Sequence, residues 1–192
     1  MLEWMFAAAV VALSLAAKGP PPPHRFLSVD AARHRVTITL IASYDGENGG
    51  FNFDGYSRFL MWTVPRGWRV RVVCKNRGPL RHSCAVVKGP DSSRLAFPGA
   101  AIPHSRIGLE SGHTARFTFR ASKTGVYRFA CLVPGHEGAR MWDVLKITRG
   151  GKPTVVDLRA KRPRSSRVLR TRSLGLRNSA RPRLRSRARS VQ

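Results

Sequence analysis

The sequence is short of acidic residues. It contains 10 Asp and Glu against 35 Lys and Arg in 192 residues, a formal net charge of +25 at pH 7. Scarce carboxylates suit an acidic external medium, and the positive charge would steer acidic partners toward the chain at low ionic strength. A stability curve that peaked at neutral pH and collapsed below about pH 5 would contradict the hypothesis that the protein works in an acidic medium.

The sequence also lacks an apolar run long enough to suit a spanning helix. The run at residues 4–17 has fourteen residues, whereas a spanning helix needs about 20. Its length suits a signal peptide. However, the residue before it is the acidic Glu3, and no basic residue precedes it. A longer membrane anchor and a buried N-terminal element are the alternatives. We predict that residues 1–18 are a signal peptide or N-terminal membrane anchor and that the protein is extracytoplasmic, either periplasmic or at the cell surface.

No segment shows a long helical period of apolar residues. Short β-branched or alternating segments recur between turn sequences, at residues 36–41, 68–74, 115–119 and 126–130, and this pattern is typical of strands. About 120 residues are enough for one core and too few for two. We predict an all-β, Greek-key β-sandwich in a single domain, residues 31–150.

The segments on either side of this domain have biased compositions. Residues 19–30 include four successive prolines, which predict a stiff linker. Residues 151–192 are rich in arginine, with 13 basic and no acidic residues from Arg159 onward. We predict a disordered tail there, because it cannot bury enough apolar surface to fold. The tail is either a plain solvated extension or a contact for nucleic acid, anionic lipid or an acidic protein.

Cysteine is scarce, but one of the three cysteines stands in a distinctive pattern. Cys131, His136 and Met141 place a thiol, an imidazole and a thioether at equal five-residue steps. One more imidazole from a distant strand would complete a His₂Cys set with a weak axial Met, as in mononuclear blue-copper sites. His82 is the best candidate, since it follows a Gly-Pro turn and opens an apolar run. The other histidines lie in loop or linker sequence.

Simpler interpretations exist for each of these residues. His82 could be a strand-edge histidine that binds nothing, and Met141 a core residue. Cys131 could be a buried thiol, half of a disulfide, or a nucleophile paired with His136. However, a nucleophilic Cys and its His usually lie far apart in sequence, and structural zinc sites usually recruit two to four thiolates. One copper ion explains all the positions together.

Residues that are missing around Cys131 exclude other copper architectures. Ala130 and Leu132 flank it where an oxygen-reducing copper cluster would have histidines, and the loop has no second cysteine for a binuclear centre. A single redox copper without an open coordination position is suited to outer-sphere electron transfer. We therefore expect no enzymatic activity and no small-molecule substrate.

The remaining cysteines, Cys74 and Cys84, have inward parity with Val72 and Val86 on neighbouring strands. They could form one disulfide, as in many exported proteins. Because the Cα separation cannot be determined from sequence, we favour two separate buried thiols.

From about Val36 to Ile147 the chain resembles a small blue-copper protein of the cupredoxin family, most similar to sulfocyanin and rusticyanin. The specific part of the resemblance is the ligand loop, with four residues in each gap. The resemblance implies one type 1 copper bound by His82, Cys131, His136 and Met141. It also places Ser83 where several relatives have an Asn that links the two ligand loops, so we expect a changed hydrogen bond and a comparatively high reduction potential.

The resemblance implies electron transfer between Cu(I) and Cu(II) in an extracytoplasmic respiratory chain. A cytochrome or terminal oxidase would be the redox partner, and electrons would leave through the edge of His136, beside an apolar patch of Pro79, Leu80, Pro134 and Gly135. An extracytoplasmic copper-binding or storage protein without a carrier role is the alternative. Nucleic acid is a poor partner for an exported chain.

Overall fold

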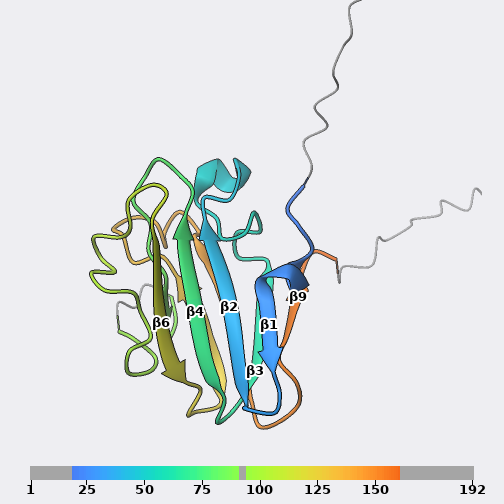
Figure 1. Cartoon of the computed structure of the whole chain (residues 1–192). Helices are drawn as coiled ribbons and strands as arrows, with labels where there is room; N and C mark the ends of the chain where they lie inside the picture. Colours follow the sequence, from blue (N-terminus) through green and yellow to red (C-terminus); the bar gives the residue numbers. More distant parts are fainter. Residues whose placement is uncertain (1–18, 91–93, 161–192) are drawn as a thin grey trace, which may run out of the picture. The chain divides into compact units, whose positions relative to one another are not determined.

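The computed structural model describes residues 19–90 and 94–160, which form two β-sheets (Figure 1). One sheet has the strand order β1-β2-β4-β6 and the other β5-β7-β8-β3-β9. Two short 3-10 helices, η1 and η2, precede β1 and β3. The elements are η1 (Pro23–Phe26), β1 (Leu27–Asp30), β2 (Arg35–Ala42), η2 (Glu47–Gly50), β3 (Leu60–Pro65), β4 (Arg69–Asn76), β5 (Ala85–Val87), β6 (Thr114–Arg120), β7 (Gly125–Ala130), β8 (Trp142–Thr148) and β9 (Thr154–Asp157).

Successive strands alternate between the two sheets. From β2 to β7 each connection passes to the opposite sheet, and as a result β2 runs parallel to β4 and β3 parallel to β8, while the other pairs are antiparallel. Such crossing connections are the mark of a Greek-key sandwich. The predicted all-β sandwich is confirmed.

The core lies between the sheets and follows the period-two pattern of the strands. In β4, Val70, Val72 and Cys74 are fully buried, whereas Arg69 and Arg71 are exposed. Successive side chains of a strand point to opposite faces, so one face of this strand is apolar and the other basic. The predicted inward parity of this segment is confirmed, and each fully buried Val contributes about 1.5–3 kcal/mol.

The prediction of two separate thiols was wrong. Cys74 and Cys84 form a disulfide, with their Cα atoms 5.9 Å apart. Cys74 lies near the end of β4 and Cys84 just before β5, in the opposite sheet, so both inward-pointing side chains meet in the core. Parity along each strand predicted that both are buried, but not that the two strands face each other. Cys131 is the free cysteine of the described residues.

The folded part of the chain extends past both predicted domain boundaries. Helix η1 and strand β1 lie within residues 19–30, where a linker was expected, and β9 lies within residues 151–192, the expected tail. The short strands at these places pair with β2 and β3. The Tyr56 hydroxyl also donates a hydrogen bond to the carbonyl of Pro21 at 2.9 Å, so the proline run contacts the domain.

Residues 1–18, the predicted signal peptide or anchor, and residues 161–192, most of the predicted tail, lie outside the described part of the chain. Within residues 19–90 and 94–160, no helix has the length and apolar character that crossing a membrane requires.

Candidate metal centre

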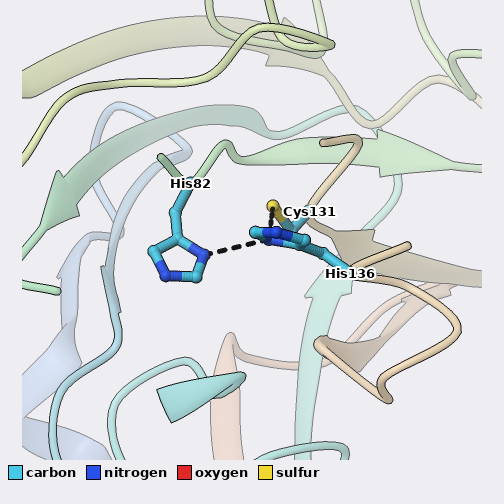
Figure 2. A group of neighbouring side chains, drawn as sticks. All are labelled: His82, Cys131 and His136. Carbon is cyan, nitrogen blue, oxygen red and sulfur yellow. Dashed lines mark hydrogen bonds between the residues drawn. The ribbon is translucent and has the colours of Figure 1, made fainter. Parts of the chain in front are cut away.

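Three of the four predicted ligands converge between two loops (Figure 2). His82 lies in the β4–β5 loop, whereas Cys131 and His136 lie in the β7–β8 loop. The two Nδ1 atoms of the histidines are 3.2 Å apart, and the Sγ atom of Cys131 is 3.4 Å from Nδ1 of His136. All three ligand atoms lie within 4.8 Å of one another. The fold thus brings together residues that are far apart in the sequence.

Met141 closes the same loop. Its backbone N–H donates a hydrogen bond to the carbonyl of His136 at 3.0 Å, and its carbonyl accepts one from the N–H of Cys131 at 3.2 Å. Its side chain is fully buried, as is that of Cys131. The equal five-residue steps of the sequence therefore correspond to a loop in which the three residues are linked through the backbone.

The centre is almost closed to solvent. His82 is 1% exposed and His136 is 9% exposed. The histidines judged weaker from the sequence are all exposed; they are His24, His34, His104 and His113. His136 is thus the more accessible of the two clustered imidazoles.

Ser83 links the two loops and contacts the thiol. Its backbone N–H donates to Sγ of Cys131 at 3.2 Å, and its hydroxyl lies 3.6 Å from the same sulfur. The hydroxyl oxygen also accepts a hydrogen bond from the N–H of Leu132 at 2.8 Å. The expected role of this position as a tie between the loops is therefore kept by serine.

Burial sets the protonation of the cluster. It lowers the pKa of His82 from 6.5 to about 4, with a smaller contribution from nearby His136, and it also lowers the pKa of His136. Both imidazoles are therefore neutral at neutral pH and offer lone pairs to a cation. Burial raises the pKa of the Cys131 thiol, while the hydrogen bonds from Ser83 lower it. A metal that binds here must displace the thiol proton.

The β4–β5 loop is fixed by its surroundings. The disulfide joins its two ends, and the backbone of His82 exchanges two hydrogen bonds with Leu109, at 3.2 and 2.7 Å. The side-chain amide of Asn76 donates to the carbonyls of Leu80 and Leu109. Gly108 has a φ of +82°, and a Cβ there would lie 2.9 Å from the His82 carbonyl oxygen, so this close approach requires glycine.

Two residues that frame the cluster were given no role from the sequence. The Phe51 ring meets His136 edge-on, with centroids 4.9 Å apart, and lies 6.3 Å from the ring of His82. Asn48 of η2 donates to the carbonyls of Phe51 and Ala139, at 2.8 and 2.7 Å. These two hydrogen bonds attach η2 to the β7–β8 loop. No local sequence pattern marks Phe51 or Asn48, because each acts through contacts between segments that are distant in the sequence.

The donor set fits copper. A buried thiol and two neutral imidazoles combine sulfur with nitrogen ligands, and the buried Met141 of the same loop offers a thioether. The cluster contains no carboxylate, the ligand that calcium and magnesium prefer. It also contains one thiolate rather than the two to four of most structural zinc sites. Type 1 copper sites use this combination of ligands.

A family model described as the sulfocyanin (SoxE) domain matches residues 22–152, about two thirds of the chain. A copper-resistant cuproprotein, CopI of Rubrivivax gelatinosus, is 29% identical over 120 residues, which is 58% of this chain and 66% of that protein. The chain thus spans just under two thirds of this relative's length.

Two solved structures are similar over most of their own length. Reduced auracyanin from Roseiflexus castenholzii is 26% identical, with a TM-score of 0.42 over 58% of this chain and 96% of that chain. Rusticyanin from Thiobacillus ferrooxidans is 18% identical, with a TM-score of 0.46 over 64% of this chain and 86% of that chain.

Proposed function

The chain belongs to the sulfocyanin domain family of cupredoxins, and from this premise we propose that it carries single electrons. The proposed site is one type 1 copper bound by His82, Cys131, His136 and Met141. When bound, copper supplies a one-electron Cu(I)/Cu(II) couple. The convergence of two neutral imidazoles and a buried thiol within 4.8 Å is the observation that carries this proposal.

The protein's part in this function is to hold the ligands still and to exclude water. The disulfide and Asn76 fix the loop of His82, and Ser83 joins that loop to the one that bears Cys131. Ligands that are fixed in this way move little when the charge of the centre changes. All four side chains are buried, which supports a carrier rather than an enzyme.

His136 is the proposed route for the electron, because it is the more exposed imidazole. Two apolar side chains from neighbouring loops are well exposed, Leu80 at 51% and Ile107 at 58%. Leu80 was predicted from the sequence, whereas Ile107 was missed, because its loop reaches His82 only in the folded chain, through Gly108 and Leu109. Apolar contact surfaces of this kind suit brief docking, which typically buries less than about 1,200 Å². A cytochrome or a terminal oxidase is the proposed partner.

The proposed place of action is outside the cytoplasm, in a respiratory chain. A structural disulfide between Cys74 and Cys84 supports this location, since such bonds persist mainly in oxidising compartments. The apolar run at residues 4–17 is the proposed signal or membrane anchor.

A copper-binding protein without a carrier role is the second candidate. The likeness to a protein named as a copper-resistant cuproprotein favours it. The two candidates differ at Met141. Replacing it with Gln would shift the reduction potential of a carrier and impair its electron exchange, whereas a storage protein would keep its copper-binding role.

The visible spectrum of the copper-loaded protein tests the carrier proposal. We expect an intense thiolate-to-copper band near ~600 nm that bleaches on reduction, returns on oxidation, and is absent in Cys131→Ser. Ser83 is unchanged in both proteins, so the residue that ties the two loops together is the same in the parent and in the variant. A colourless protein that still holds copper would contradict the proposal and favour storage.

A further inference from the structure

A row of arginine side chains crosses the outer face of the sheet β1-β2-β4-β6, the sheet in front in Figure 1. Arg35 of β2 pairs in register with Arg69 of β4, and Arg69 pairs with Arg120 of β6. Neighbouring strands lie about 4.7–4.9 Å apart, so the three side chains start side by side. All three are exposed, because the opposite face of these strands forms the core.

Three surface hollows adjoin at this row, and Arg69 lines all of them. The largest, about 530 Å³, is also lined by Arg71 and by the hydroxyl residues Ser28, Thr37 and Thr118. A second hollow of about 240 Å³ lies between Arg33, His34, Arg35, Gly67, Arg69 and Arg120. The third, about 410 Å³, shares Arg69, Thr118 and Arg120. Guanidinium and hydroxyl donors are therefore concentrated around one point of the sheet.

Carboxylates of the described chain offset the positive charge of this row only in part. Like charges opposite each other on neighbouring strands are destabilising. Asp30 of β1 pairs in register with Arg35 and lines the largest hollow. The hydrogen bond from Arg33 lowers the pKa of Asp30 most, and the charge of Arg35 is a further cause that lowers it. The Asp30 carboxylate nevertheless forms its ion pair with Arg33, at 3.2 Å. Within residues 19–90 and 94–160, Arg35, Arg69 and Arg120 form no ion pair with a carboxylate. An external anion would relieve this repulsion.

The donor set indicates which anion would fit. Arginine presents a planar fork of N–H groups that binds the oxygen atoms of oxyanions in pairs, whereas lysine offers a point charge. The neighbouring hydroxyl groups add further donors. We propose that this face is a binding site for a tetrahedral oxyanion, either free sulfate or phosphate or the phosphate of a lipid headgroup.

The proposed oxyanion site is separate from the metal centre. Arg69 is the first residue of β4, and His82 follows its last residue, Asn76. The eight residues of this strand span more than about 20 Å. The inference therefore does not depend on the proposed function, and either can fail without the other.

Titration calorimetry of the full chain with sulfate and with phosphate, at an ionic strength held constant with chloride, tests the proposal. We expect saturable binding that weakens at least about tenfold in Arg35→Gln/Arg69→Gln. The matched control, Arg25→Gln/Lys146→Gln, removes two exposed charges outside the three hollows and should bind within about twofold of the parent. Arg35→Lys/Arg69→Lys keeps the charge and should still bind several-fold more weakly.

A second arm uses phosphatidylcholine vesicles that contain phosphatidylglycerol. Binding of the free ions identifies a soluble oxyanion as the ligand. Vesicle binding that is reduced in Arg35→Gln/Arg69→Gln, in the absence of free-ion binding, identifies the headgroup phosphate. Equal losses in the control pair, or no saturable binding in either arm, would overturn the proposal. An unchanged far-ultraviolet circular dichroism spectrum shows that each variant is folded.

Discussion

The two loops that supply the predicted ligands are fixed in different ways. The β7–β8 loop is held by its own backbone, with hydrogen bonds that join Cys131, His136 and Met141. The β4–β5 loop, which carries His82, is held by a disulfide and by pairing with Leu109. Half of the centre is thus encoded locally as a spacing, while the other half exists only in the folded sandwich.

The strongest test of this difference removes the ligand that the fold brings in. In His82→Ala the hydrogen bonds of the β7–β8 loop remain, but one imidazole is lost. We expect copper affinity to fall more than about 100-fold, beyond the effect typical of residues that only support ligands. Competition with a copper chelator measures this affinity. His113→Ala, at an exposed histidine, is the control, and an equal affinity in both variants would show that His82 does not bind copper.

Removing the disulfide should loosen one loop and spare the other. For Cys74→Ala/Cys84→Ala we expect the free energy of unfolding to fall by about 2–4 kcal/mol, as measured by urea denaturation of the metal-free protein. Copper affinity should fall as well, because His82 loses the clamp on its loop. If stability falls while copper affinity stays the same, the disulfide does not position His82.

A smaller effect is expected at the contact between the loops. Ser83→Ala removes the hydroxyl that lies 3.6 Å from the Cys131 sulfur but keeps the backbone N–H donor. Hydrogen bonds to a ligand sulfur stabilise its negative charge and raise the reduction potential. We expect the potential to fall on the order of 50 mV, where 59 mV is a tenfold change for one electron. Voltammetry measures it, and a rise in potential would contradict this account.

Far from solvent, Asp54 adds a pH-dependent effect on stability. Burial raises the pKa of this carboxyl well above 3.8, against the hydrogen bond from the Ile41 N–H. The folded protein then holds a proton that the unfolded chain releases above about pH 4, so its contribution to stability is present at low pH and lost as pH rises toward the folded-state pKa.

We therefore expect Asp54→Asn to be more stable than the parent at pH 7, on the order of 1 kcal/mol, and to gain less at pH 4. Asparagine keeps an oxygen that can accept the Ile41 hydrogen bond. Urea denaturation at both pH values measures the difference. A gain that is larger at pH 4 than at pH 7 would refute the assignment.

The sequence predicted the features that repeat locally. Alternation in β4 gave the strand and its buried face, and the spacing of Cys131, His136 and Met141 predicted which residues share a loop. It could not predict the Cys74–Cys84 disulfide or the place of Phe51, since both depend on how distant segments face each other. The sequence predicted a stiff linker at residues 19–30 and a disordered tail after residue 150, because strands of four residues give too short a pattern to identify.

X-ray absorption spectroscopy at the copper edge of the loaded protein tests the central claim most directly, because it counts the ligands from both loops at once. We expect one short sulfur contact and two imidazole nitrogens in the parent protein, with one imidazole remaining in His82→Ala. A parent spectrum with a single imidazole, or one without the short sulfur contact, would contradict the site that the two loops are proposed to form.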